Sequence, residues 1–191
     1  IWLDSLEIQG FQLTPENFSE LYDILVTFSR IKPFLKKGGF PLWYVNSRGL
    51  LSSSRSRVAI EDIFGHIFQI KADASPELKR ITRSIFRVEE KIKEKMQAFF
   101  LKAKQQNWLK GDQIAWRNGR SVLPLKVSQK RKIKGIVQDQ SATGQTVFIE
   151  PLEIIELNNQ LMELQFSEIE EKNRILKELT SFFKPLTDQI R

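Results

Sequence analysis

The chain has 191 residues, of which 41% are hydrophobic, and a formal net charge of +7. This hydrophobic fraction excludes a wholly disordered chain, and the length suits one or two domains. Cysteine is absent, which excludes disulfides and thiolate metal sites and agrees with a reducing cytosol. No apolar run reaches the roughly 20 residues that a membrane-spanning helix needs.

The first predicted helix begins at Thr14-Pro15-Glu16, where a hydroxyl N-cap, an N1 proline and an early carboxylate favour a helix start. Apolar residues recur every three or four positions from Phe18 to Phe34, so one face is expected to be buried up to the Gly38-Gly39 stop. The segment 38–57 is expected to be irregular. Residues 1–72 are therefore predicted to form a helical core segment, and the lack of an initiator methionine suggests that the chain begins inside a longer protein.

Two longer helices are predicted further along the chain. The first starts at Ser75-Pro76-Glu77 and carries a single apolar stripe, so a helix is expected over 75–108. The second follows Pro151 and carries a stripe of matching length over 151–186. Because each stripe is narrow, the two helices can bury them against one another as an antiparallel pair.

Between these helices, residues 113–149 change from the helical period to short β-prone runs. Asn118-Gly119 and Ser141-Ala142-Thr143-Gly144 separate the runs, as hairpin turns do. The predicted fold is therefore mainly α, with a long antiparallel helix pair and a small antiparallel β clamp inserted at its tip. Residues 73–191 are expected to contain both helices and the clamp.

Positive charge is concentrated in this insertion. Residues 102–134 contain ten lysines and arginines and one acidic residue, Asp112, a local charge of +9. Such a cluster on predicted β turns suits a polyanion, most simply a nucleic-acid backbone, although a solvated turn gives the same pattern. The candidate binding residues are Arg117, Arg120, Lys126, Lys130, Arg131, Lys132, Lys134, Ser141 and Thr143. For Ser141 and Thr143, a hairpin turn that binds nothing is the favoured explanation.

Other polar residues give no comparable indication of chemistry. His66, the only histidine, lies among apolar neighbours and is expected to be a partly buried structural residue. The glutamates from Glu150 to Glu171 are scattered around a predicted helix, so a solvated face is expected rather than a metal site. No catalytic residue and no metal ligand is predicted.

Four blocks of the sequence resemble the MutS-II family, a mismatch-repair-like group of bacterial MutS paralogues that often carry an Smr endonuclease domain. The blocks are DASPEL at 73–78, RNGRSVLPLK at 117–126, KGIVQDQSATGQTVFIEP at 134–151 and ELNN at 156–159. Residues 6–37 resemble the family more loosely, so the resemblance covers roughly residues 6–186, apart from 38–60. One departure is Gln138, where family members commonly have histidine, which puts any proton-transfer role at that position in doubt.

The resemblance implies core and lever helices with a clamp at their far end, taken from a dimeric ATPase that uses ATP and Mg²⁺. It also implies binding of branched or junction DNA in recombination control and DNA repair or, in some members, action on collided ribosomes. The chain has no Gly-x-x-x-x-Gly-Lys-Ser/Thr phosphate loop and no Smr sequence, so no enzyme activity and no cofactor is expected for this fragment.

The function predicted from the sequence is therefore a non-catalytic lever and clamp that binds DNA and couples it to an ATPase outside this chain. The alternative is a dimerisation and ribosomal-RNA docking module of a ribosome rescue factor. A homodimer is expected for the full-length protein, with no membrane partner. The expected location is the bacterial cytosol, at the nucleoid or the ribosome.

Overall fold

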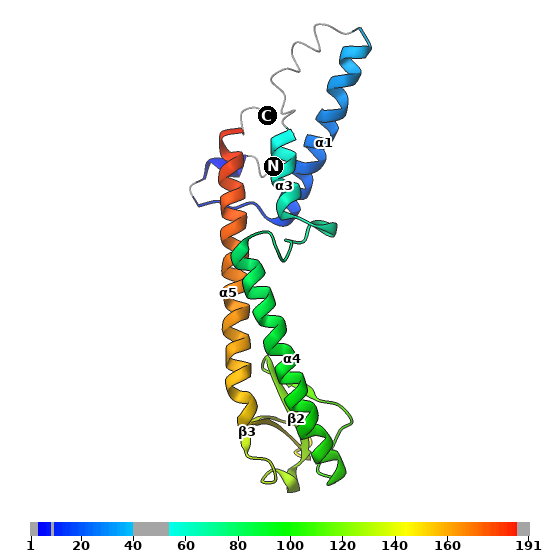
Figure 1. Ribbon diagram of the computed structural model, residues 1–191, viewed down its shortest axis with the longest axis vertical. Coiled ribbons are helices and arrows are strands. Elements are labelled where there is room, and N and C mark those ends of the chain that lie inside the picture. The colour runs from blue at the N-terminus through cyan, green and yellow to red at the C-terminus, as the bar shows by residue number, and fades with distance from the viewer. Residues whose placement is uncertain (1–3, 9, 40–53, 187–191) are drawn as a thin grey trace. The chain divides into compact units, whose positions relative to one another are not determined.

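The computed structural model describes residues 4–8, 10–39 and 54–186 (Figure 1). The α-helices are α1 (Pro15–Lys37), α3 (Ser54–Ile63), α4 (Pro76–Gln105) and α5 (Leu152–Phe183). The strands are β1 (Ala115–Arg117), β2 (Arg120–Lys126), β3 (Gly135–Gln140) and β4 (Thr146–Pro151). Short 3₁₀ turns are η1 (Asp4–Glu7), η3 (His66–Phe68), η4 (Val127–Gln129) and η5 (Lys184–Leu186). The predicted mainly α fold with a small antiparallel sheet is confirmed.

The chain divides into two compact units. Unit 1 comprises Ile1–Lys79 and Ile169–Arg191, and unit 2 comprises Arg80–Glu168. The division falls within α4 and within α5, so both long helices contribute residues to each unit. Each unit has a hydrophobic core of its own.

The core of unit 1 is formed by η1, α1, α3 and the C-terminal part of α5. Helix α1 begins as predicted, because the Thr14 hydroxyl accepts a hydrogen bond from the Asn17 amide and the Asn17 side chain accepts one from the Thr14 amide. Phe18 is fully buried and contacts Phe64 and Phe183, with ring centroids 5.5 and 6.1 Å apart. These aromatic contacts join three elements that are distant in the sequence.

Three expectations for unit 1 need correction. The apolar face of α1 is buried only over its first half, since Ile31 is 38% and Phe34 69% exposed. Ser54–Arg57, expected to be irregular, form the first turn of α3; positions 40–53 of that expectation lie outside the described residues. His66 is exposed at η3, where the chain turns through two left-handed residues, Ile67 (φ 60°) and Phe68 (φ 51°).

Helix α4 begins and ends with defined caps. The Ser75 hydroxyl accepts a hydrogen bond from the Leu78 amide at 2.9 Å. At the other end, Asn107 is left-handed (φ 56°), its amide bonds to the Lys104 carbonyl, and the Trp108 amide bonds to the Ala103 carbonyl. This is a Schellman motif with asparagine in the position usually taken by glycine. The motif ends α4 at Gln105, three residues before the predicted end.

In unit 2, α4 and α5 run in opposite directions beside the sheet (Figure 1). Their apolar residues share one core with strands β2 and β4. The buried members are Val88, Ile92, Met96, Phe100, Ala103, Leu123, Leu125, Ile133, Val147, Ile149, Ile154 and Leu161. Within unit 2, the predicted stripes of α4 and α5 therefore face the same core, and alternate residues of the strands complete it. The C-terminal part of the α5 stripe, which includes Leu179, belongs instead to the core of unit 1.

The sheet has the order β1-β2-β4-β3, and all its strand pairs are antiparallel. Asn118 and Gly119 join β1 to β2 with φ values of 54° and 72°, as a two-residue type I′ hairpin requires. Gly135 lets β3 approach β4 closely, because a Cβ atom there would lie 2.2 Å from the Glu150 carbonyl oxygen. A bulge between Val137 and Asp139 places Gln138 out of register.

Candidate nucleic-acid interface

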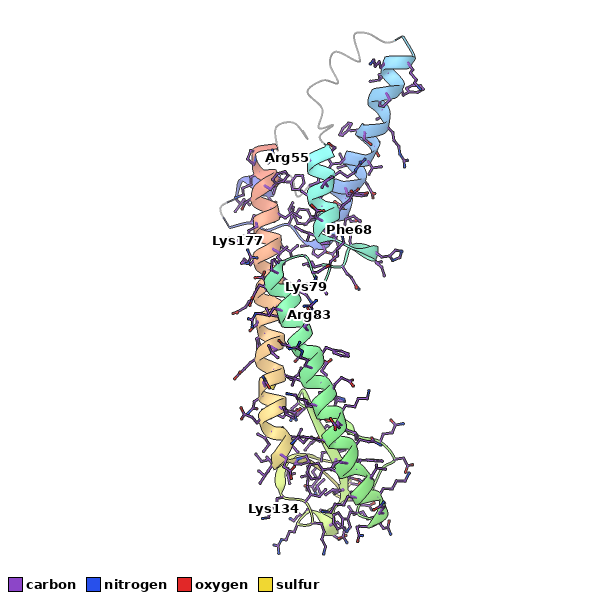
Figure 2. The ribbon with its side chains drawn as sticks, in the orientation of Figure 1. Arg55, Phe68, Lys79, Arg83, Lys134 and Lys177 are labelled. Atoms are coloured by element: carbon purple, nitrogen blue, oxygen red, sulfur yellow. The ribbon has the colours of Figure 1, made fainter. Side chains whose placement is uncertain are left out.

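Four of the predicted binding residues lie together between η4 and β3, and we refer to Lys130, Arg131, Lys132 and Lys134 as the cationic turn. The side chains of all four are exposed. Figure 2 shows Lys134 at the sheet end of unit 2, with its side chain directed away from the sheet. Over residues 54–186, no carboxylate lies within ion-pair distance of any of the four. Their charge is therefore available to an external anion.

The backbone of the cationic turn is held in place from within. The Lys130 amide donates to the Val127 carbonyl at 3.3 Å, and the Lys132 amide donates to the Gln129 carbonyl at 2.9 Å. Ile133, in the middle of the turn, is only 8% exposed and belongs to the unit 2 core. This single buried residue fixes the turn to the core while its cationic neighbours project outward.

Arg120 does not join this group. Its guanidinium donates from Nη1 to Glu150 Oε1 at 2.9 Å and from Nη2 to Asn159 Oδ1 at 2.7 Å. Glu150 is completely buried and the Arg120 side chain is 21% exposed, so the pair is largely buried in unit 2. Arg120 therefore has a structural partner that competes with any phosphate.

Arg117 and Lys126 are also engaged within the protein. The Arg117 guanidinium pairs with Asp139 at 3.1 Å and lies over the Phe148 ring, 4.0 Å from its centroid. Lys126 donates from Nζ to the main-chain oxygen and to Oδ1 of Asn107, at 2.9 and 2.7 Å. Both side chains stabilise the sheet and the end of α4, and they retain only part of their capacity for a ligand.

Ser141 and Thr143 lie in the β3–β4 turn. The Ser141 hydroxyl accepts a hydrogen bond from the Thr146 amide at 3.0 Å, and it lies 3.4 Å from the Thr143 hydroxyl. Gly144 is left-handed with φ of 69°, and its amide donates to the Ser141 carbonyl. The hydrogen-bonding groups of this turn are thus largely used to close the hairpin.

A buried polar network around Glu150 was not predicted from the sequence. Glu150 Oε1 accepts hydrogen bonds from Arg120 and from Asn158 Nδ2 (2.8 Å), and Oε2 accepts one from Gln138 Nε2. This carboxylate, expected on a solvated helix face, instead lies in strand β4, next to its last residue, and has four donor contacts. The available signal was its position directly after the apolar run 147–149.

Glu171 forms a second buried acidic site, within unit 1. It accepts two hydrogen bonds from Arg174, both at 2.7 Å, and one from the Ser75 hydroxyl at 2.6 Å. The bonds from Arg174, supported by Ser75, lower the pKa of Glu171 to about 2, although burial opposes the shift. Arg174 also pairs with Glu178. The arrangement anchors the start of α4 to α5 inside unit 1.

The described part of the chain offers no metal centre, because no three His, Cys, Asp or Glu side chains there are placed to hold an ion. Over the same residues, none of the helices combines the length and the apolar character needed to cross a membrane.

No family model matches the chain. Endonuclease MutS2 of Symbiobacterium thermophilum is 35% identical to it over 175 residues, which are 91% of this chain and 22% of that protein. Endonuclease MutS2 of Alkaliphilus oremlandii is 32% identical over 186 residues, which are 95% and 24% of the two chains. This chain is a relative of the MutS2 proteins.

The match to MutS2 confirms the resemblance drawn from the four sequence blocks. The identity is higher over a shorter stretch, since Endonuclease MutS2 of Lacticaseibacillus casei is 43% identical over 119 residues, which are 62% of this chain and 15% of that protein. The chain spans about a quarter or less of the length of these MutS2 relatives. It therefore corresponds to one part of a longer protein architecture.

Proposed function

We propose that this chain is a non-catalytic lever and clamp of a MutS2-type protein, and that its cationic turn binds the backbone of branched or junction DNA. The observation that carries the proposal is the cationic turn itself: four exposed cations, anchored by buried Ile133 and unpaired within residues 54–186. Long cationic side chains on a fixed turn can reach successive phosphates. The relationship to MutS2 supports this assignment.

Such binding is independent of base sequence. Contacts to phosphates position a protein on nucleic acid, whereas sequence is read by groups that enter a groove. The cationic turn lies beside a sheet and not at the end of a helix that could enter the major groove. Its affinity for DNA should therefore depend strongly on salt and little on sequence.

The long helices provide the second part of the proposal. Helices α4 and α5 are continuous over 30 and 32 residues and contribute to both compact units. We assign them the role of levers that relay DNA binding to an ATPase domain outside this chain, in recombination control or DNA repair. ATP and Mg²⁺ would be bound there, and a homodimer would form in the full-length protein.

The test is a charge-removal series measured against a DNA junction. Replacing Lys130, Arg131, Lys132 and Lys134 with Ala should lower the slope of log K against log salt by about 0.9 per lost phosphate contact, or about 3.6 in total. The melting temperature should change little, since exposed substitutions alter stability by about 0.5 kcal/mol or less. An unchanged slope would show that the cationic turn is only a solvated loop that does not contact phosphates.

A matched control removes the same charge elsewhere. Arg30, Lys36, Lys37 and Lys177 are exposed residues of unit 1 and also comprise three lysines and one arginine. Their quadruple Ala variant has the same net charge as the test variant. If it lowers the salt slope equally, binding follows net charge and the specific role of the cationic turn is rejected.

A second function remains as the alternative, in which the cationic turn docks on ribosomal RNA. Its phosphates would be recognised by the same four side chains. Comparing duplex DNA, a four-way junction, structured RNA and intact ribosomes at one salt concentration separates the two. A clear preference for ribosomes over the junction favours the alternative.

A further inference from the structure

A surface groove adjoins the cationic turn in unit 2. It encloses about 300 Å³ and is lined by Phe99, Lys102, Trp108, Lys132, Ile133, Lys134, Leu152 and Glu153. A smaller hollow of about 240 Å³ shares Phe99, Lys102 and Glu153 with it and adds Lys95 and Ala98. The two hollows therefore form one groove beside α4 and the start of α5, which we call the turn groove.

The turn groove combines an apolar floor with a cationic rim. Phe99 and Trp108 are only partly buried against the core, so part of each aromatic side chain faces the groove. Leu152 is 54% exposed at its edge. Four lysines lie along the rim (Lys95, Lys102, Lys132 and Lys134), against one carboxylate, Glu153. The net positive charge favours an anion that also carries a flat apolar group.

Lys132 and Lys134 belong to both the cationic turn and the turn groove. A nucleic-acid backbone held by the cationic turn therefore brings its attached nucleotides to the mouth of the groove. In an intact duplex the bases are stacked and paired, and none of them can enter. An unpaired base can do so, and proteins that bind single strands hold such bases against aromatic side chains beside cations.

We propose that the turn groove binds one unpaired nucleotide, with its base against Phe99 and Trp108 and its phosphates at Lys102, Lys132 and Lys134. The volume fits, because about 300 Å³ is at the small end of the roughly 300–1,000 Å³ typical of ligand pockets. This inference rests on the proposed binding of nucleic acid by the cationic turn. It adds that strands with unpaired bases are preferred to continuous duplex.

The test compares three labelled probes by fluorescence anisotropy on the full chain: a short oligothymidylate, the same strand without bases, and a duplex of equal length. One base held in the groove should make the oligothymidylate bind about 5- to 150-fold more tightly than the abasic strand. The abasic strand carries the same phosphates, so the difference measures the contribution of the base alone.

A variant pair locates the effect without disturbing the core. Leu152 and Leu101 are 54% and 49% exposed on helices of unit 2, but only Leu152 lines the turn groove. Leu152→Glu should abolish the preference for the oligothymidylate over the abasic strand. Leu101→Glu adds the same charge and should preserve that preference.

A second variant pair tests the rim. Lys102 and Lys104 are both exposed cations in the last turn of α4, and only Lys102 lines the groove. Lys102→Ala should reduce the salt slope for the oligothymidylate by about 0.7, the value for one phosphate contact on a single strand. Lys104→Ala should leave that slope unchanged.

The outcomes separate the two proposals. Equal binding of oligothymidylate and abasic strand, with a slope that still depends on the cationic turn, overturns the nucleotide site and leaves the backbone-binding proposal intact. Absence of binding to all three probes and to a four-way junction at low salt overturns both. If an acidic peptide containing tyrosine binds wild type but fails to bind Leu152→Glu, while the oligothymidylate and the abasic strand bind wild type equally, the groove is a peptide site and the nucleotide proposal is rejected.

Discussion

Arg120 and Glu150 show how a cation in a basic segment can serve the fold. The Glu150 carboxylate of this ion pair is completely buried, so water cannot compensate its charge if Arg120 is lost, whereas 21% of the Arg120 side chain is exposed. Asn158 Oδ1 is buried in the same network without a hydrogen-bond partner, so the network already contains one unsatisfied acceptor. The network therefore has little tolerance for the loss of another member.

We expect Arg120→Ala to lower the free energy of unfolding by about 3–5 kcal/mol, because it leaves the Glu150 carboxylate buried without its cation. The matched change Arg131→Ala removes an exposed arginine of the cationic turn and should cost about 0.5 kcal/mol or less. Urea unfolding of both variants checks this. Similar midpoints for the two would show that the buried pair contributes no more than a surface charge.

Glu171 gives unit 1 a specific dependence on pH. Its pKa is about 2 in the folded protein, compared with an ordinary value of 4.5, because Arg174 and Ser75 donate hydrogen bonds to the ionised carboxylate. A lowered pKa means that the folded state binds this proton less readily than the unfolded state. The resulting stability is present above about pH 4.5 and is lost as the pH falls towards 2.

We expect Glu171→Gln to destabilise the protein at neutral pH and to matter progressively less as the pH falls below about 4.5. Urea midpoints of wild type and variant across an acid series measure the difference. Glu163→Gln, at an exposed position of α5, is the control and should give no such convergence. A wild-type advantage that stays constant through the acid range would assign the effect of Glu171 to packing.

At the scale of the element, a substitution in α5 can show how much the buried apolar stripes contribute to the stability of unit 2. Leu161 is 1% exposed and belongs to the core shared with α4 and the sheet. Leu161→Ala should cost roughly 2–5 kcal/mol, since it removes buried methyl groups and leaves a cavity. Leu101→Ala, at a half-exposed position, should cost much less. Thermal or urea unfolding distinguishes the two, and equal costs would contradict a buried role for the α5 stripe.

The elements also show what the sequence could predict. The starts of α1 and α4 carry proline and a capping hydroxyl, and each begins where the pattern indicated. Asn118-Gly119 correctly marked a tight turn, but β1 before it has only three residues and too little periodicity to be recognised. The end of α4 was placed too late, because a Schellman motif closed by Asn107 has no strong sequence signal.

The sequence predicted the parts of the candidate site that depend on charge alone. It did not predict the parts that depend on how side chains pack in the folded protein. The side chains of the cationic turn have no ion-pair partner among the described residues. Cations that are close in the sequence therefore remain together at the surface of the fold. In the sequence Arg120 resembles the cations of the turn, but the direction of its side chain depends on how β2 pairs with β4. The turn groove likewise depends on Phe99 and Trp108 being only partly covered, a tertiary property that periodicity does not report.

At the scale of the whole molecule, the charge distribution separates binding from folding. The chain has a net charge of +7, while residues 102–134 alone carry +9, so the remainder is slightly acidic. The buried carboxylates Glu150 and Glu171 have cationic partners, whereas the cationic turn has no carboxylate partner within residues 54–186. Salt should therefore weaken the interaction with nucleic acid far more than it weakens the fold.

If the four side chains of the cationic turn each contact one phosphate, raising the salt concentration from roughly 50 to 200 mM should weaken binding to a DNA junction about 150-fold, following a slope of about 3.6. The urea midpoint should stay nearly constant over the same range, because the unit cores are apolar. Anisotropy titrations and unfolding curves at matched salt concentrations measure both quantities. Binding that persists unchanged at the higher salt would instead indicate an interface dominated by apolar contacts, and the exposed Phe86 and Phe166, at 64% and 65%, would then be the first side chains of unit 2 to replace.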